Sequence, residues 1–160
     1  MSDLLIREAR ADDRMALIAL MSVLHDSEAA HEANRSSGAL SGESHLDWVL
    51  HEIDMLGGAT LVAEVAGVVE GFLCYAVEED PGTFVKPEMR RHGMIWDICV
   101  SAAMRGRGLG SRLLHAAEAD LLARGVREMR LYVLAANSRA RALYEEAGYV
   151  DYERLMAKRF

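Results

Sequence analysis

Hydrophobic and polar positions in the first third of the chain predict one strand followed by two helices. Apolar and polar residues alternate over Leu4–Arg10, which is typical of a strand. After Asp12, a favourable N-cap, apolar residues recur at helical spacing, at Met15, Leu17, Ile18, Met21 and Leu24. The polar, Ser- and Gly-rich segment Asp26–Glu43 predicts a loop with room for helical turns. Ser44 then caps a predicted helix with apolar positions at Leu46, Val49, Leu50, Ile53 and Leu56.

The middle of the chain predicts three strands separated by turns. Thr60–Ala66 and Val68–Glu78 are expected to pair around a turn at Gly67. An Asp-Pro-Gly turn follows them. Met94–Val100 is then a dense apolar strand in which Asp97 is the single charged residue.

After this strand the pattern alternates between helix and strand. A long amphipathic helix has its apolar positions at Leu109, Leu113, Leu114, Ala117, Leu121 and Leu122. A strand at Met129–Leu134, a helix at Ser138–Ala147 and a closing strand at Tyr149–Phe160 complete the prediction. This order indicates an α/β (α+β) fold, a mixed sheet with helices on both faces. No repeat or linker interrupts it, so residues 1–160 are expected to form one domain.

Charge is divided unevenly along the chain. The net charge is −7, but residues 1–80 hold sixteen acidic residues against four arginines, whereas residues 81–160 hold nine against fourteen basic residues. A basic half suits a polyanionic ligand and an acidic half a cationic one, although ordinary variation between surfaces would give the same split. The overall acidity argues against duplex nucleic acid as a partner.

Composition also argues against a membrane protein and a metal site. No apolar run approaches the roughly 20 residues that a membrane-spanning helix needs. No basic segment followed by an apolar one opens the chain, so we expect no signal peptide and a cytoplasmic location. Cys74 and Cys99 lie in apolar, strand-like runs, where a thiol usually packs as a small hydrophobe. Neither they nor the histidine spacings match a zinc pattern, and no metal is expected.

The segment with the clearest chemistry is Arg105-Gly106-Arg107-Gly108-Leu109-Gly110-Ser111-Arg112, between a buried strand and a helix. The first turn of a helix has unpaired N–H groups and a positive dipole end, which together bind phosphate. Glycines let the backbone approach phosphate oxygens, and arginines supply charge and forked donors. The pattern therefore predicts a phosphate-binding turn.

Other glycine-rich motifs fit less well. A nucleotide P-loop needs Gly-Lys-Ser/Thr at its end, which this segment lacks. The dinucleotide fingerprint is G-x-G-x-x-G, whereas this chain has G-x-G-x-G. A disordered arginine–glycine tail would not be flanked by periodic apolar elements. A tight strand-to-helix turn with solvated arginines remains the structural alternative.

Two stretches resemble the GCN5-related N-acetyltransferases (GNAT). Val100–Leu114 resembles the family signature, Arg/Gln-x-x-Gly-x-Gly/Ala after a strand, and Asn137–Tyr149 is similar to its N-x-x-A-x-x-L-Y-E-x-x-G-F/Y segment. The opening Ile6-Arg7-x-Ala9, followed by Asp13, also fits. The resemblance spans nearly the whole chain and implies a mostly antiparallel sheet whose central strands at 95–100 and 129–134 are parallel and splay apart.

The resemblance implies acetyl-CoA as the co-substrate, with no metal. The coenzyme diphosphate would be cradled by the backbone and side chains of Arg105, Gly106, Arg107, Gly108, Leu109, Gly110 and Ser111. The pantetheine arm would pair, like an added strand, with the edge formed by Ile98, Cys99 and Val100. Asn137 would bind this arm or cap the following helix, and the two roles are compatible.

The resemblance suggests two catalytic residues. Tyr144 matches the family's general acid toward the coenzyme sulfur, although a half-buried helical tyrosine would fit the same pattern. Asp97 stands where relatives often have a Glu-Asp pair, and strand alternation places it with Ile95 and Cys99, opposite Met94, Trp96 and Ile98. It therefore binds the substrate ammonium or supports the structure. Trp96 lines the acceptor pocket or packs in the core.

The expected activity is acetyl transfer to a primary amine, with a small cationic amine as the leading acceptor. The predicted loop contributes Asp26, Glu28, His31, Glu32 and Glu43, with His25 and His45 at its edges, either as a site that attracts a cation or as solvated charge. Only 12 residues follow Gly148, too few for the family's final hairpin, so a homodimer would complete the substrate wall. A protein N-terminus or lysine as acceptor, or an inactive coenzyme-binding sensor, remain alternatives.

Overall fold

A computed structural model describes residues 4–160 and places four α-helices and five strands within them. In chain order these are β1 (Leu4–Glu8), α1 (Arg14–Ala29), α2 (Gly38–Met55), β2 (Ala59–Val65), β3 (Val68–Glu79), β4 (Arg91–Val100), α3 (Leu109–Ala123), β5 (Met129–Leu131) and α4 (Ser138–Glu146). Short 3-10 turns lie at Ala11–Asp13, Pro87–Met89 and Ala102–Met104.

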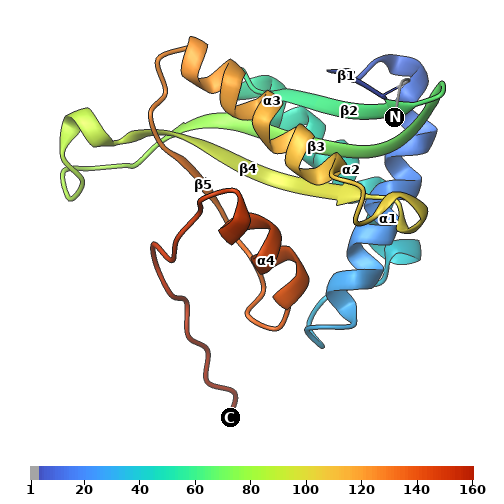
Figure 1. Ribbon diagram of the computed structural model, residues 1–160. Helices are drawn as coiled ribbons and strands as arrows, with labels where there is room; N and C mark the ends of the chain where they lie inside the picture. Colours follow the sequence, from blue (N-terminus) through green and yellow to red (C-terminus); the bar gives the residue numbers. More distant parts are fainter. Residues whose placement is uncertain (1–3) are drawn as a thin grey trace.

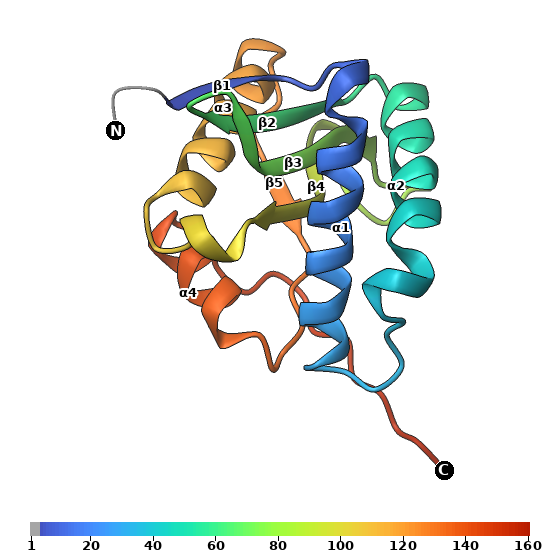
Figure 2. The ribbon, with the colours of Figure 1, turned by 90° about the vertical axis from the view of Figure 1, so that its right-hand side faces the viewer.

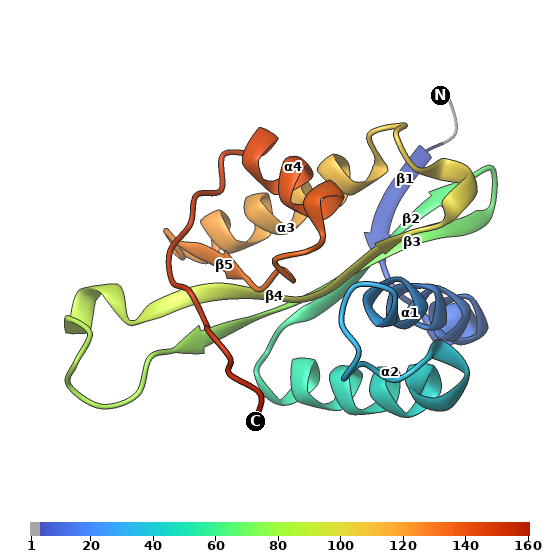
Figure 3. The same cartoon turned by 90° about the horizontal axis from the view of Figure 1, so that it is seen from below.

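The five strands form one sheet in the order β1-β2-β3-β4-β5 (Figure 1). Neighbouring strands are antiparallel except β4 and β5, which are parallel. Helices α1 and α2 cover one face, and α3 and α4 lie on the other (Figures 2 and 3). The mixed sheet with helices on both faces is therefore confirmed.

Alternation along the strands creates one apolar core on each face of the sheet. On the α1–α2 side, Leu17, Met21, Leu46 and Val49 pack against Val62, Phe72 and Cys74. On the α3 side, Leu109, Leu113, Leu114 and Ala117 pack against Leu61, Leu73 and Tyr75. The two cores hold the central strands β3 and β4 from both faces and so fix the position of the site.

Strands β4 and β5 separate soon after they meet. Their pairing joins only Gly93–Ile95 to Met129–Leu131, so within residues 4–160 no strand continues along 96–100 on the side away from β3. The predicted strand to Leu134 is shorter than expected, because the chain leaves the sheet at Tyr132, whose side chain is exposed. The predicted splay of the two parallel strands is confirmed, and it leaves one backbone edge of β4 free.

A β-bulge in β4 overturns the expected alternation around Asp97. Ile95 and Asp97 oppose two adjacent residues of β3, so Trp96 is an extra residue in β4. Ile95 packs in the core on the α3 side, whereas Trp96 packs on the α1–α2 side. Asp97 also faces the α1–α2 side, where it contacts His45 of α2. The prediction that Asp97 shares a face with Ile95, opposite Trp96, was therefore wrong.

Both early helices are longer than the sequence pattern predicts. Helix α1 continues to Ala29, and α2 begins at Gly38, so Ser44 lies inside α2 instead of capping it. A Cβ on Gly38 would lie 2.2 Å from the Ser22 carbonyl oxygen, and one on Gly42 would lie 2.4 Å from Ser22 Oγ. These glycines, which suggested a loop, instead allow the two helices to pack closely.

The closing strand predicted at Tyr149–Phe160 is absent. This segment has no regular secondary structure (Figure 1). Its side chains beyond Tyr149 are exposed. A strand needs a partner edge, and β5 offers only three residues. Instead, polar contacts hold the segment, such as the ion pair between Arg141 and Asp151.

Candidate active site

The turn between β4 and α3 has an open corner that only glycine can form without strain. Gly106 and Gly108 have φ angles of 74° and 79°, in the left-handed region that other residues rarely adopt. A Cβ on either residue would meet no atom within 4 Å, so this corner is bordered by open space. The two glycines therefore combine the required backbone conformation with room for a ligand against the backbone.

The first turn of α3 directs unpaired donors into this corner. Gly108 is the N-cap and has no side chain to satisfy the amides that follow it. The first amide bonded to the N-cap carbonyl is that of Arg112, at 3.1 Å, so the N–H groups of Leu109, Gly110 and Ser111 precede it. The Leu109 side chain is buried in the core, so only its backbone borders the corner. This arrangement fits a diphosphate.

The remaining residues of the turn have different surroundings. Arg105 is half-buried and its Nε donates a hydrogen bond to the Val100 carbonyl oxygen at 3.2 Å, whereas Arg107 is exposed. A Cβ on Gly110 would lie 3.1 Å from Leu143 Cδ2, so this glycine also lets α4 pack against α3. The cradle and the position of α4 therefore depend on the same turn of helix.

The free edge of β4 leads from this corner toward the centre of the molecule. Ile98 and Val100 pack on the α3 side of the sheet, and the Cys99 side chain is buried on the α1–α2 side. Burial raises the pKa of Cys99 to about 11 and that of Cys74 to about 12, so both thiols stay protonated near neutral pH. This edge therefore offers backbone N–H and C=O groups, and no side chains, to an extended ligand.

Asn137 occupies the N-cap of α4. Its Oδ1 accepts a hydrogen bond from the Ala140 amide at 3.1 Å. The structural role expected for this residue is therefore present, and it orders the helix that carries Tyr144.

Tyr144 of α4 is buried in the core on the α3 side of the sheet. Burial raises its pKa to about 12, and the negative charges of Glu28 and Asp97 act in the same direction. Its ring packs edge-on against Tyr149, with centroids 6.0 Å apart. Tyr144 therefore remains a protonated donor at any physiological pH, close to carboxylates from α1 and β4.

Asp97 contacts a row of imidazole and indole rings that the sequence pattern did not bring together. His45 Nε2 lies 3.4 Å from Asp97 Oδ2, and the His45 ring stacks at 4.7 Å on His25 and at 5.4 Å on Trp48. Trp48 in turn lies 5.3 Å from Trp96. The row joins α1, α2 and β4 beside the free edge of β4.

Most of the charged residues predicted around the acceptor have other roles. Asp26 accepts a hydrogen bond from the Gly38 amide at 2.7 Å, and so supports the start of α2. Glu43 pairs with Arg14, and Glu32 with Arg159. Glu28 pairs with Arg35 at 3.6 Å, but burial raises its pKa against the effect of this partner, and the charge of Asp97 acts in the same direction as burial. Of the acidic residues in that predicted loop, Glu28 is the one placed beside Asp97.

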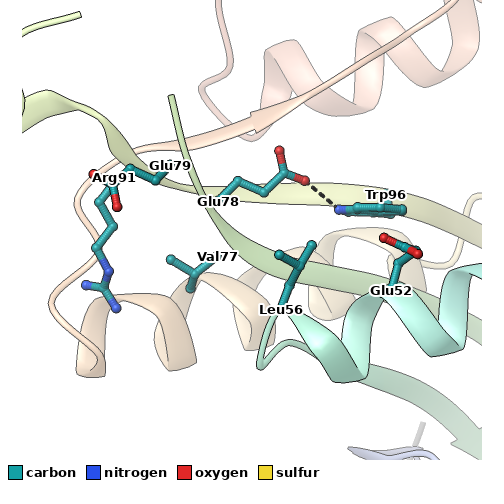
Figure 4. Close-up of a pocket in the computed structure, with 7 residues that line it drawn as sticks. All are labelled: Glu52, Leu56, Val77, Glu78, Glu79, Arg91 and Trp96. Carbon is teal, nitrogen blue, oxygen red and sulfur yellow. Dashed lines mark hydrogen bonds between the residues drawn. The ribbon is translucent and has the colours of Figure 1, made fainter. Parts of the chain in front are cut away.

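A groove of about 560 Å³ lies beside Trp96, between α2 and the β3–β4 pair (Figure 4). Its walls are formed by Glu52, Leu56, Val77, Glu78, Glu79, Arg91 and Trp96. Trp96 Nε1 donates a hydrogen bond to Glu78 Oε1 at 2.8 Å, which fixes the indole as one wall (Figure 4). Both alternatives for Trp96 are therefore present, since it packs against the core and lines a groove.

Trp48, Glu52 and Glu78 are members of this region that sequence analysis missed. Four-residue spacing places Trp48 and Glu52 on one side of α2, a signal that depends on knowing where the helix begins. Glu78 gave no local signal, because it belongs here through its hydrogen bond with Trp96.

Residues 4–160 were also compared with the requirements of a metal site and of a membrane-spanning helix. Among residues 4–160, no group of three His, Cys, Asp or Glu side chains is arranged to hold a metal ion. No helix in this range is both long and apolar enough to cross a membrane.

Comparisons with known proteins agree with this geometry. The mycothiol acetyltransferase of Beutenbergia cavernae is 47% identical over 57 residues, which are 36% of this chain and 19% of that protein. This chain spans 19% to 41% of the length of the mycothiol acetyltransferases that it matches.

Solved structures share the fold. A GCN5-related N-acetyltransferase from Ralstonia eutropha superimposes with a TM-score of 0.75 at 22% identity, covering 98% of both chains. A predicted acetyltransferase from Clostridium acetobutylicum, determined with acetyl-CoA, has a TM-score of 0.74 at 16% identity, covering 98% of this chain and 96% of that one. The Acetyltransferase (GNAT) family matches residues 20–149, most of the chain. The protein therefore belongs to the GNAT family of acetyltransferases.

Proposed function

We propose that this protein transfers an acetyl group from acetyl-CoA to the primary amine of a small cationic molecule. The observation that carries the proposal is the open glycine corner at the start of α3, continuous with the free edge of β4 and ending near Tyr144. Members of the family bind the same co-substrate, as the acetyl-CoA in the Clostridium acetobutylicum structure illustrates.

Each part of this path supports one requirement of acetyl transfer. The amides of Leu109, Gly110 and Ser111 suit the coenzyme diphosphate, and the free edge of 96–100, opposite β3, suits the two amides of the pantetheine arm. Acetyl-CoA supplies the activated thioester. Tyr144, whose pKa is raised to about 12 by burial, holds a proton for the leaving sulfur. A free backbone N–H of β4 would stabilise the charge on the thioester oxygen.

The surroundings of Asp97 favour a cationic acceptor. An amine arrives as an ammonium, which carboxylates attract and aromatic faces accommodate. Asp97 and Glu28 supply negative charge beside Tyr144. Next to them, the groove lined by Trp96 carries Glu52, Glu78 and Glu79 against Arg91 alone. The Tyr144 proton donor favours an enzyme over an inactive coenzyme sensor.

We also propose that two copies of the chain associate. Large apolar side chains stay exposed along the C-terminal segment, at Val150, Tyr152, Leu155 and Met156, and a second copy would cover them. Light scattering after gel filtration is expected to give the mass of a dimer, and a monomer mass would contradict this proposal. The cytoplasmic location expected from the sequence stays a prediction.

The activity is tested by following thiol release from acetyl-CoA with a panel of amines. We expect turnover with at least one cationic small molecule among spermidine, lysine and kanamycin, and none with the same compound after its amines are blocked. Peptides with a free N-terminus or an internal lysine test the protein-acceptor alternative. Acetyl-CoA binding without turnover of any amine would contradict the proposal and identify a sensor.

A further inference from the structure

The carboxylate of Asp97 is poorly placed to release a proton by itself. Its side chain is 12% exposed, at the bulge of β4 and beneath α2. A carboxyl group that had taken a proton from an ammonium would need to lose it before the next turnover. In a buried position this loss requires a neighbouring group that can accept the proton and reach water.

His45 is that neighbour. Its Nε2 lies 3.4 Å from Asp97 Oδ2, and its side chain is 32% exposed, so it touches both the buried carboxylate and solvent. Imidazole can gain and lose a proton near neutral pH, which a lysine or a carboxylate ordinarily cannot. Trp48 stacks on its other side at 5.4 Å and restrains the ring.

Hydrogen bonds make His25 unsuited to the same role. The Ser41 hydroxyl donates its hydrogen to the Ser37 carbonyl oxygen at 3.0 Å, so it accepts at 2.6 Å from the His25 ring nitrogen Nδ1. The Nδ1 proton of His25 is thereby held in place. Burial, and next the nearby His45, lower the pKa of His25, which keeps this ring neutral. The neutral His25 ring lies tilted beside His45, with centroids 4.7 Å apart, and adds no positive charge there.

We propose that Asp97 and His45 form a proton relay for the acceptor amine, with His45 as the outlet. This inference depends on the acetyl transfer proposed above. The ammonium gives one proton to Asp97 Oδ2, which passes it to His45 Nε2, and His45 releases it to water. As the carbon–nitrogen bond forms and the carbon–sulfur bond breaks, Tyr144 protonates the sulfur and regains a proton from the nitrogen. One proton is released in each turnover, through His45.

Several charged groups surround the relay and set its response to pH. Glu28 lies in α1 and Arg35 in the segment after it, and the two side chains form an ion pair at 3.6 Å. The positive charge of Arg35 also lowers the pKa of His25. Tyr144 faces Asp97 from α4. The charged and titratable groups around the relay are therefore Tyr144, the Glu28–Arg35 ion pair and Asp26, which acts on His25.

The first test compares two matched substitutions on α2. His45→Gln keeps the size of the side chain but cannot carry a proton, and His51→Gln makes the same change at an exposed position of the same helix. With the fastest amine of the panel, we expect kcat of the His45 variant to fall about 30- to 100-fold, and that of the His51 variant to stay within about twofold. Calorimetry is expected to give both variants the wild-type affinity for acetyl-CoA.

Two further measurements separate a relay from a structural role. Imidazole in the buffer is expected to raise kcat of His45→Ala by about tenfold and to leave His51→Ala unchanged, because a free base can occupy the vacated space. The double variant Asp97→Asn/His45→Gln is expected to be no slower than Asp97→Asn alone, because the two residues act in series.

The outcomes distinguish failure of the relay from failure of the function. Wild-type turnover with an unchanged kcat in His45→Gln would overturn the relay and leave the acetyltransferase proposal standing. A loss of kcat accompanied by loss of acetyl-CoA affinity, or not restored by imidazole, would also overturn it. Acetyl-CoA binding without turnover of any amine by the wild-type protein would overturn both.

Discussion

The glycine corner proposed for the coenzyme and the end of the site proposed for the acceptor are built differently. The corner is local: Gly106, Gly108 and the amides that begin α3 belong to one continuous turn. The acceptor end is assembled from α1, α2, β4 and α4, which contribute Glu28, His45, Asp97 and Tyr144. A co-substrate common to a family can be bound by the backbone of one turn, whereas the acceptor is recognised by side chains that the fold brings together.

The largest effect is expected from filling the coenzyme corner. In Gly108→Val the new Cβ enters the open space and the left-handed φ becomes strained, so we expect the affinity for acetyl-CoA to fall about 100-fold or more. Gly67→Val is the matched control, with φ 81°, the same open surroundings and a place in the β2–β3 turn. Calorimetry should show loss of binding in the first variant alone, and equal affinity in both would contradict the role of the corner.

Tyr144→Phe probes the point where the two regions meet. Phenylalanine keeps the ring that packs against Tyr149, so this substitution should leave the fold intact while kcat falls about 10- to 100-fold. Because burial raises the Tyr144 pKa to about 12, wild-type kcat should show no alkaline decline from this group up to about pH 10. An unchanged kcat would remove Tyr144 from the mechanism.

Tyr149→Phe is the control for that substitution. The Tyr149 hydroxyl is buried with no hydrogen-bond partner among residues 4–160, so its removal should raise the free energy of unfolding by about 1 kcal/mol. Denaturant unfolding measures this gain, and kcat should match the wild type. A loss of kcat equal to that of Tyr144→Phe would show that the pair acts through packing.

At the acceptor end, neutralising a single carboxylate should have a smaller effect. Glu28→Gln removes negative charge beside Asp97 and Tyr144, so we expect KM for a cationic amine to rise about 3- to 5-fold with the affinity for acetyl-CoA unchanged. Glu43→Gln, at an exposed ion pair with Arg14, should leave both values unchanged. Equal changes in KM in the two variants would mean that the overall negative charge of the protein, and not the position of Glu28, sets the KM for the amine.

The smallest effect on activity is expected at the support of α1, where the change is one of stability. Asp13 is buried and accepts hydrogen bonds from Arg7 at 2.7 and 2.9 Å, and this partner lowers its pKa to about 2. A lowered pKa stabilises the fold above the unfolded value near 3.8, and this stability is lost as pH falls toward 2. Asp13→Asn should cost about 1 to 2 kcal/mol at pH 7, a difference that shrinks at low pH.

The adjacent, exposed Asp12 provides the control, since Asp12→Asn should change the free energy of unfolding by less than about 0.5 kcal/mol. Denaturant unfolding at pH 7 and pH 3 measures both variants. A pH-independent loss in Asp13→Asn would mean that the ion pair is not its cause.

The contrast between the two regions also explains how far the sequence could predict them. The glycine turn before α3 was predictable because it is one continuous segment, and the sheet with helices on both faces followed from hydrophobic periodicity. The partnership of Asp97 with His45 was not, because it depends on the bulge at Trp96 and on α2 beginning at Gly38. Glycines at 38 and 42 suggested a loop, since their contact with Ser22 is visible only in three dimensions.

The most direct measurement compares acetyl-CoA with acetyl-pantetheine, which lacks the diphosphate and the nucleotide, in calorimetric titrations of the wild-type protein. If the amides at the start of α3 bind the diphosphate, acetyl-CoA should bind at least about 100-fold more tightly, and Gly108→Val should abolish most of that difference. Equal affinities of the wild-type protein for the two compounds would contradict the account.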